Sequence, residues 1–543
     1  MKKLISLLLA MVMILALFAG CGSSSATEES EEEPESAETT DTATEENASG
    51  LPDSYPLLCD DGSLSLSMYQ SMVPILTDIE DFNDLYFWQE VSSRTGVTLE
   101  WQMVSFTVAE EQLNLLIAAD DLPNIVCTAQ YYTDGISSAV ENDVFADIAD
   151  YLEDYAPDYL EIVSQDDVYP VVFDDNGSIV YFYEIGSEEF PPNNGVFLRG
   201  DLLAEQGLDI PVTYDEYEET FLALKNAYDM EAPIYYDSSS YPDWIASGLN
   251  VSMDFSLDAD GNCIYGPVED NFREYLQIMN RWYEEGLLYQ DFYSVSESDS
   301  SLVDYMSSGK SAVAFQYCET IGTVELSGEG EYFSAGYLPR ENEDDEIHLS
   351  SGIDTKVLTS RCWGIGANST EEEIQTACML MNYFYTEEGA LLLNYGVEGL
   401  SFEYQDDGTP WYTDLIIDNP DGLTQTQAMI TYIGWNVPGS ADYTKYNVSA
   451  LTDWAEFVEV WGEADNAWAM PQVSLSVEEE EAYSAVSTDV ETYLEEAVAR
   501  FIIGDLDIDD DAAWENYLEY MNSLGVNTMI EVYSAALERF NER

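Results

Sequence analysis

DLYFWQEVSSRTGVTLEWQMVSFTVAEEQLNLLIAADDLPNIVC, residues 84–127, is the stretch that decides the fold, because helical and extended patterns alternate along it. Residues 84–95 carry apolar side chains at helical spacing and predict a helix that ends at Gly96. Residues 97–104 predict a strand, since every second side chain from Val97 onward is apolar.

The same alternation continues on both sides of this helix and strand. Residues 110–119 predict a second helix, which Asp120-Asp-Leu-Pro123 ends before the apolar run at 125–127. The alternating run Leu64-Ser-Leu-Ser-Met68 predicts a strand in front of them. The resulting order, β-α-β-α-β, predicts an α/β fold with a mostly parallel sheet covered by helices.

Two short segments are expected at the ligand-binding edge of this sheet. Open parallel sheets bind ligands beyond the carboxyl ends of their strands. Met68-Tyr-Gln70 and Thr128-Ala-Gln130 follow or end predicted strands. We therefore expect both segments to lie beside a ligand crevice.

The rest of the chain contains three predicted turns and a predicted pair of helices. Residues 174–177, 258–261 and 405–408 each place Asp or Gln and a glycine between extended stretches, as tight turns require. For residues 258–261 a turn is favoured over a calcium site. Apolar stripes at 514–521 and 529–540 predict two packed C-terminal helices.

The N-terminus has the layout of a secretory signal, expected at residues 1–20. Lys2 and Lys3 precede an apolar run from 4 to 18, and Ala19-Gly20 leads to Cys21. Cys21 in this position resembles the bacterial lipobox cysteine, which receives a diacylglyceryl group. An ordinary cleaved signal or an uncleaved anchor is the alternative, although the run is shorter than the roughly 20 residues of a membrane span.

Residues 21–50 predict a disordered acidic tether, because Ser, Thr, Ala and Glu dominate them and they cannot bury enough apolar surface to fold. The rest of the 543-residue chain is too long for one ordinary core. It predicts two domains or lobes.

The charge excludes some partners. The chain has 108 acidic and 15 basic residues, a formal net charge of −93. Binding to phosphate backbones needs clustered Lys and Arg, so nucleic acid is excluded as a partner. The strong negative charge suits a cationic ligand or a salty habitat, but the favoured explanation is that it keeps the protein soluble. The cysteines after Cys21 are scattered without metal-like spacing, and no disulfide or metal site is predicted.

Few catalytic classes remain open. His348 is the single histidine and lies in an acidic stretch, which disfavours histidine-dependent hydrolases and histidine-based zinc sites. A glycoside hydrolase needs only two carboxylates, but no acidic pair stands out. We therefore expect a binding protein without catalytic residues or cofactors, with a glycoside hydrolase as the enzymatic alternative.

A series of motifs, in this order, resembles the family 1 extracellular solute-binding proteins, especially their large lipoprotein branch. The matching segments are Arg94-Thr-Gly-Val97, 115–125, 145–152 with Tyr155-Ala-Pro157, 198–203, Gly207-Leu208, 211–216, Gly286-Leu-Leu288, Ser308-Gly-Lys-Ser311, 394–399 and Phe501-Ile-Ile-Gly504.

The resemblance implies a two-lobe, periplasmic-binding-protein-like fold of type II, with a ligand cleft between lobes joined by crossing strands. The first lobe is expected at 51–190 and 366–439, and the second at 191–365 and 440–543. Crossings are expected near 186–194, 362–366 and 439. Such a protein closes on its ligand like a hinge and presents it to an importer.

The implied role is that of a monomeric, lipid-anchored receptor on the outer face of the cell membrane. Its partners would be an oligosaccharide and the permease subunits of an ABC transporter. A peptide or polyamine receptor on the same scaffold, and a structural surface protein, remain alternatives.

Carbohydrate clefts use aromatic rings for stacking and amides or carboxylates for hydrogen bonds. Five residues at expected strand ends, loops and crossings are predicted to face the cleft: Tyr69, Gln130, Trp244, Gln316 and Trp435.

Overall fold

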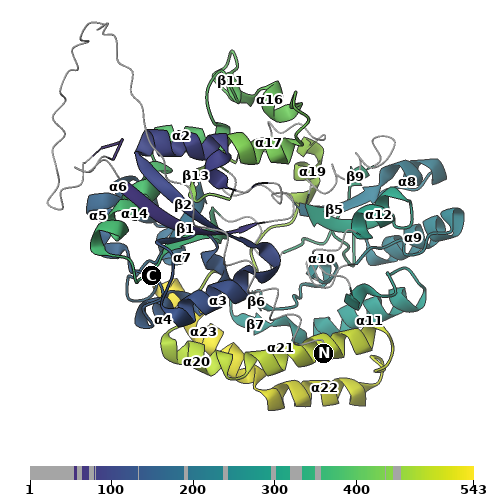
Figure 1. The fold of residues 1–543 in the computed structure, drawn as a ribbon. Helices are drawn as coiled ribbons and strands as arrows, with labels where there is room; N and C mark the ends of the chain where they lie inside the picture. The colour runs from purple at the N-terminus through teal and green to yellow at the C-terminus, as the bar shows by residue number, and fades with distance from the viewer. Residues whose placement is uncertain are drawn as a thin grey trace, which may run out of the picture. The chain divides into compact units, whose positions relative to one another are not determined.

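A six-stranded sheet gathers strands from three distant parts of the chain (Figure 1). The computed structural model describes residues 54–57, 64–72, 79, 81–132, 134–188, 194–236, 243–294, 301–317, 333–348, 356–434, 436–443 and 454–543. Across the sheet the strand order is β13-β4-β10-β3-β1-β2. Their bounds are β1 Leu64–Met72, β2 Val97–Ser105, β3 Ile125–Val126, β4 Tyr181–Gly186, β10 Val357–Ile365 and β13 Gly439–Ala441.

The predicted β-α-β-α-β start is confirmed. β1 pairs in parallel with both β2 and β3, and helices α2 (Tyr86–Thr95) and α3 (Ala109–Ala119) lie between them in the chain. α2 ends at Gly96, whose φ of 76° is left-handed. A Cβ at Gly96 would lie 2.4 Å from the carbonyl oxygen of Leu57, so only glycine fits there.

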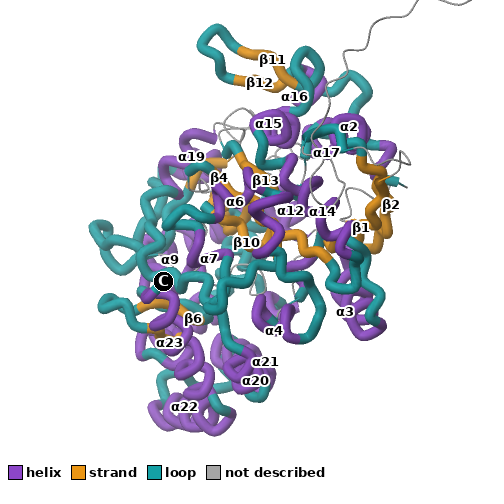
Figure 2. The backbone as a smooth tube through the Cα atoms, turned by 90° about the vertical axis from the view of Figure 1, so that its left-hand side faces the viewer, coloured by secondary structure: helices purple, strands orange, loops and turns teal. Residues whose placement is uncertain are grey.

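The other half of the sheet is formed by the returning chain. β10 pairs antiparallel with both β3 and β4, and β13 pairs in parallel with β4. Figure 2 shows β13, β4 and β10 grouped on one side of the sheet and β2 at its far edge. The chain therefore leaves this sheet after β4, returns to it at β10, and returns again at β13.

The first hydrophobic core packs around this sheet. Its buried side chains include Met68, Val91, Phe145, Tyr159, Phe182, Trp363, Leu380 and Phe384. The remaining helices of this part of the chain are α4 (Gly135–Glu141), α5 (Leu152–Tyr155), α6 (Pro157–Val163), α7 (Tyr169–Val172), α14 (Glu371–Tyr383), α15 (Glu387–Tyr395), α16 (Asp414–Ile417) and α17 (Gln425–Tyr432).

A second, separate core surrounds a three-stranded sheet of order β8-β5-β9. The strands are β5 (Asn194–Arg199), β8 (Val313–Tyr317) and β9 (Phe333–Ala335). Val196 and Leu198 of β5 face this core, while Phe197 between them packs in a smaller cluster on the opposite face. That smaller cluster contains Trp461, whose ring lies so close to Gly195 that a Cβ there would be 2.4 Å from it.

The helices around the second core come from two parts of the sequence. The first group is α8 (Gly200–Gln206), α9 (Tyr214–Tyr228), α10 (Asp243–Ala246), α11 (Asp270–Glu284) and α12 (Ser301–Ser307). The second group is α19 (Trp454–Trp461), α20 (Val477–Ser484), α21 (Ser487–Ile502), α22 (Asp511–Leu524) and α23 (Val526–Glu542). The predicted C-terminal pair, α22 and α23, is confirmed, with Gly525 as the left-handed cap of α22.

The three predicted turns are also present. Gly177 donates to the Asp174 carbonyl, Gly261 to that of Asp258, and Gly408 to that of Gln405. The second turn joins β6 (Phe255–Leu257) to β7 (Cys263–Tyr265), and the third joins β11 (Phe402–Tyr404) to β12 (Pro410–Tyr412).

Core membership differs from the expected lobe boundary at residue 365. The buried residues Val357, Cys362, Trp363 and Ile365 belong to the first core, because β10 pairs with β3 and β4. Sequence reasoning had placed residues 357–365 in the second lobe. β10 thus belongs to the first core, and the lobe boundaries stay a prediction.

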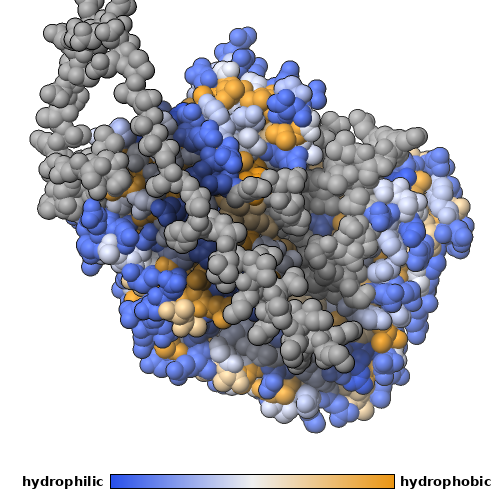
Figure 3. Space-filling model, in the orientation of Figure 1, coloured by the Kyte–Doolittle hydropathy of each residue, from blue (hydrophilic) through white to orange (hydrophobic). Residues whose placement is uncertain are grey.

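Within the described residues, none of the helices combines the length and apolar character that crossing a membrane requires. Cys127, Cys263, Cys362 and Cys378 are buried free thiols. Cys21, Cys59 and Cys318 lie outside the described residues, as does the predicted tether. On the face drawn in Figure 3, the described surface is mostly hydrophilic, with apolar residues in scattered patches.

Two arginines tie the C-terminal helix to the first core. Arg539 Nε donates to Asp175 at 2.5 Å, and its other nitrogens contact Glu479 at 2.7 and 2.5 Å. Arg543 pairs with Asp175 and also donates to the carbonyl of Phe173 at 2.6 Å. Figure 1 places the C-terminus beside α7, in agreement with these contacts.

This cluster should contribute measurably to stability. Arg539→Gln removes the ion pairs with Asp175 and Glu479 and should lower the free energy of unfolding by about 1 kcal/mol, as measured by urea denaturation at neutral pH. Arg500→Gln is the matched control, because the ion pair that Arg500 forms among the described residues is with Glu496, one turn away in α21. Equal losses in the two variants would contradict a special role for the cluster.

The contribution of the cluster should depend on pH. Burial raises the pKa of the Asp175 carboxyl group. The hydrogen bonds and positive charges of Arg539 and Arg543 together lower this pKa by more than burial raises it, so the net shift is downward. A carboxyl group whose pKa is lower in the folded state stabilises the protein fully at pH values above its unfolded-state pKa. This stabilisation is lost as the pH falls through the folded-state pKa. The difference between wild type and Arg539→Gln should therefore shrink in acid, as followed by urea denaturation at falling pH.

Candidate functional site

A cavity of about 250 Å³ opens at the carboxyl ends of β1 and β3. It is lined by Gln70, Ser71, Phe82, Leu85, Trp88, Trp101, Cys127, Thr128, Gln130, Ser360, Arg361, Trp363, Ile430, Ile433 and Asn436. All of these residues come from the parts of the chain that form the first core.

The backbone explains why these side chains meet. β1 and β3 are parallel neighbours, so the residues at their carboxyl ends share one edge of the sheet. Gln70 lies near the end of β1, and Thr128 follows β3 directly. Opposite them, the β4–β10 register shifts between Leu358 and Cys362, so β10 has a bulge or a similar irregularity there, called the bulge below. The bulge brings Ser360 and Arg361 to the cavity.

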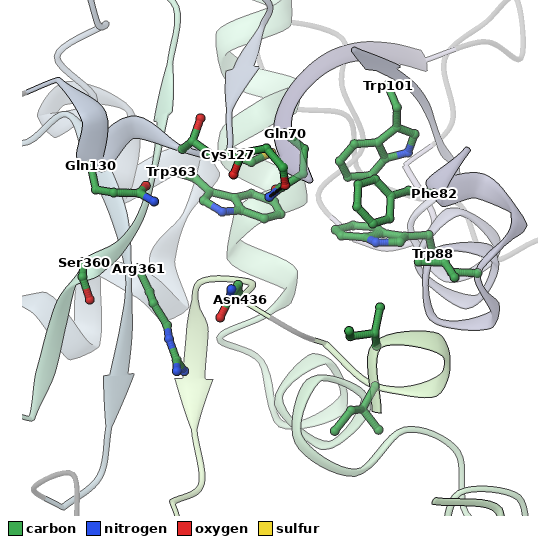
Figure 4. Close-up of a pocket in the computed structure, with 15 residues that line it drawn as sticks. Gln70, Phe82, Trp88, Trp101, Cys127, Gln130, Ser360, Arg361, Trp363 and Asn436 are labelled. Carbon is green, nitrogen blue, oxygen red and sulfur yellow. Dashed lines mark hydrogen bonds between the residues drawn. The ribbon is translucent and has the colours of Figure 1, made fainter. Parts of the chain in front are cut away.

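Aromatic rings form one wall of the cavity. The rings of Phe82 and Trp101 lie 4.9 Å apart, and those of Trp88 and Trp101 meet edge to face at 4.8 Å. Trp363 lies nearly parallel to Trp88 at 6.1 Å. Figure 4 shows Phe82, Trp88 and Trp101 on one side, and Gln130, Ser360 and Arg361 on the other. Such an arrangement presents ring faces and edges to one part of a ligand and polar groups to another part.

Two polar atoms of the cavity lining are buried without a partner. The Thr128 side chain is 1% exposed, and its Oγ1 has no hydrogen-bond partner among the described residues. The indole Nε1 of Trp101 is buried and equally unpartnered within the described chain. An unmade hydrogen bond at a buried polar atom costs roughly 1–3 kcal/mol. A ligand that supplies an acceptor for Trp101 and a polar group for Thr128 would recover that cost.

Arg361, whose side chain is 27% exposed, forms an ion pair with the buried Glu184 at the edge of the cavity. The Nη1 atom of Arg361 lies 3.0 and 2.9 Å from the two carboxylate oxygens of Glu184. The Glu184 side chain is 4% exposed, and it projects from β4 toward the bulge in β10. This pairing holds the guanidinium group in place at the cavity.

The structure describes four of the five predicted cleft residues. Gln130 lines the cavity, as do Gln70 and Thr128 of the two segments expected at the sheet edge. Tyr69 is fully buried and donates its hydroxyl hydrogen to the Ala109 carbonyl at 2.7 Å. Trp435 lies outside the described residues, although its neighbour Asn436 lines the cavity.

The two predicted residues of the second core are not at this cavity. Trp244 is buried, with its ring 6.2 Å from that of Phe315. Gln316 is half-buried on β8, opposite Gly195 of β5. Their contact with a ligand stays a prediction.

Sequence reasoning missed much of the lining. Trp88 and Trp101 were assigned to a helix and to a strand face, without a role at the site. Arg361 and Trp363 lie at an expected crossing, and an Arg-Cys-Trp-Gly run at such a point was a usable signal. His348, the single histidine, is half-buried and lies 2.7 Å from Asp465, a pair that is not part of the cavity lining.

Comparison with known proteins relates most of the chain to one class. A family model described as bacterial extracellular solute-binding protein matches residues 81–395. The polygalacturonan/rhamnogalacturonan-binding protein YtcQ of Bacillus subtilis (strain 168) is 21% identical over 487 residues, covering 83% of this chain and 88% of its own. Lipoprotein LipO of the same organism is 19% identical over 479 residues, covering 85% of this chain and 90% of its own.

Solved structures show the same fold. The S. pneumoniae ABC-transporter substrate-binding protein FusA, in complex with kestose, aligns with a TM-score of 0.71 at 16% identity, over 88% of this chain and 99% of its own. The alginate-binding protein AlgQ2 aligns with a TM-score of 0.69 at 18% identity, over 88% and 98%. The predicted fold class, a two-lobe α/β fold like the type II periplasmic binding proteins, is thereby confirmed.

The unpartnered hydroxyl of Thr128 can be tested without any ligand. Thr128→Val keeps the shape and removes the hydroxyl, so it should raise the free energy of unfolding by about 1 kcal/mol in a denaturant titration. The matched control is Thr95→Val, because Thr95 is also fully buried but its hydroxyl donates to the Val91 carbonyl at 2.7 Å. The control should lose about 1 kcal/mol. A similar loss in Thr128→Val would mean that its hydroxyl has a partner.

Proposed function

The chain belongs to the bacterial extracellular solute-binding proteins, and from that premise we propose that it captures an oligosaccharide outside the cytoplasm and delivers it to the permease subunits of an ABC importer. The aromatic wall of the cavity, with the unpartnered Thr128 hydroxyl and Trp101 N–H beside it, is the observation that carries this proposal.

Sugar chemistry matches this lining. A pyranose or furanose ring presents C–H faces, which stack on aromatic rings, and hydroxyl groups, which both donate and accept hydrogen bonds. Trp88, Trp101 and Trp363 supply rings. Gln70, Gln130 and Asn436 supply amides that can pair with hydroxyls in either sense. The names of the relatives support the same substrate class, since they include glycan-binding proteins.

Capture is proposed to involve both lobes. From core membership we place the first lobe at 54–186 and 357–441 and the second at 194–348 and 454–543. The described cavity then forms the first lobe's share of the site. The second lobe would close over the ligand, and Gln316 at the end of β8 is a candidate contact from that side. The volume of the described cavity is slightly below the roughly 300–1,000 Å³ of ligand pockets, which fits half of a site.

The proposed activity is binding without chemical turnover. The family and the similar structures are binding proteins, which supports a receptor over a glycoside hydrolase. We also retain Cys21 as the site of a lipid anchor, a monomeric state, and the outer face of the cell membrane as the location. The lipoprotein relative supports the anchor.

A thermal-shift screen tests the proposed function directly. The 51–543 polypeptide should gain thermal stability with at least one oligosaccharide and with no peptide or polyamine, because a ligand that binds the folded state alone raises the midpoint by mass action. Incubation of the stabilising sugar with the protein, followed by chromatography, should recover it intact. Cleavage would favour the hydrolase, and a response to polyamines alone would favour the alternative receptor.

One substitution tests the proposed contact. Trp101→Phe keeps an aromatic ring and removes the N–H donor, so the Kd for the stabilising sugar should rise about 2- to 12-fold, as expected for one hydrogen bond of about 0.5–1.5 kcal/mol. Trp411→Phe is the matched control, because Trp411 is 38% exposed on β12 and does not line the cavity. Calorimetric titration of both variants gives the comparison. Unchanged affinity in Trp101→Phe would remove Trp101 from the site.

A further inference from the structure

We propose that the oligosaccharide is uncharged, and that Arg361 donates hydrogen bonds to its hydroxyl groups instead of pairing with a uronate carboxylate. This inference rests on the proposed function and specifies its substrate class. It distinguishes this chain from receptors for acidic glycans. Two similar proteins are named as such receptors, one for polygalacturonan/rhamnogalacturonan and one for alginate.

The charge of the described lining is the first argument. Arg361 is the one ionised side chain among the residues that line the described cavity. Glu184 already neutralises it, with both carboxylate oxygens within 3.0 Å of Nη1. The net charge of this part of the site is therefore zero.

The burial of Glu184 fixes that neutrality. A buried carboxylate that loses its partner is left as an uncompensated charge, which is strongly unfavourable. Glu184 is held in the middle of β4, between β10 and β13, with a side chain that is 4% exposed. A uronate carboxylate would have to share Arg361 with Glu184, and two carboxylates would then face one guanidinium group.

The other arginine side chains of the described chain already form ion pairs. Every arginine in the described chain forms an ion pair with an Asp or Glu; apart from Arg361 these are Arg94, Arg199, Arg273, Arg281, Arg340, Arg500, Arg539 and Arg543. Beyond residue 50, the stretches outside the described residues contain a single basic residue, Lys445. Recognition of a carboxylate typically uses an arginine fork, and no such fork is available at the described cavity.

The electrostatic field of the whole molecule also disfavours an acidic glycan. A formal net charge of −93 repels a polyuronate during its approach, and the repulsion is strongest at low salt. A neutral glycan meets no such barrier. Its hydroxyls can accept from Arg361 and the amides without displacing Glu184.

A binding panel tests the substrate class. The 51–543 polypeptide is titrated calorimetrically, at low and at high salt, with neutral fructo-, xylo-, manno- and galacto-oligosaccharides and with oligogalacturonates and oligoalginates of matched length. At least one neutral glycan should bind with an affinity that salt leaves unchanged, and every acidic glycan should bind about 100-fold or more weakly. An acidic glycan that binds as tightly as the best neutral one would overturn the inference. Binding of no glycan in either class would instead refute the proposed function.

A substitution tests the role given to Glu184. Glu184→Gln keeps the size and hydrogen-bonding capacity of the side chain but leaves the Arg361 charge uncompensated. The variant should bind oligogalacturonate about tenfold or more tightly than wild type does. Glu388→Gln is the matched control, because Glu388 pairs with Arg94 on the exposed surface and does not line the cavity.

The outcome for the variant is decisive in either direction. No gain for oligogalacturonate in a folded Glu184→Gln protein would show that Glu184 does not exclude acidic ligands. If the variant does not fold, carboxyl-reduced oligogalacturonate on wild type replaces it: tighter binding than that of the unreduced sugar supports the inference, and equal or weaker binding overturns it.

Discussion

The antiparallel pairing of β4 with β10 is the constraint on which the rest of the structure depends. It returns the chain to its first sheet after a long excursion through the second core, and it leaves β4 open on its other side for β13. The same pairing contains the bulge that brings Ser360 and Arg361 to the cavity, and it sets Arg361 against Glu184. The architecture and the charge of the site therefore share one origin.

The cavity is built at a cost to the ligand-free protein. Its aromatic rings pack against each other, but the Thr128 hydroxyl and the Trp101 N–H are buried without partners in the described chain. Polar groups left in this state are expensive, and a ligand that pairs with them would offset the cost. The Arg361–Glu184 pair differs, because its two charges neutralise each other without a ligand.

The sequence predicted those features that depend on local periodicity. The opening β-α-β-α-β unit, the three turns and the α22–α23 pair follow from spacing within a few residues, and Gln70, Thr128 and Gln130 follow from the rule for strand ends. Tyr69 shows the limit: successive residues of a strand face opposite sides, so Gln70 lines the cavity while Tyr69 is buried. The bulge in β10 and its partners were not predictable, because they depend on pairing between distant segments.

The discontinuous cores also shape how the chain can fold as it is made. The first sheet lacks β10 until residue 365 has emerged and β13 until residue 441 has emerged, and the second core lacks α21 to α23 until nearly the whole polypeptide is complete. Nascent chains of this protein thus expose apolar segments for most of synthesis, the situation in which non-local topologies fold slowly and aggregate. The dense negative charge gives such unfinished chains mutual repulsion, which keeps neighbouring molecules apart until the last helices dock.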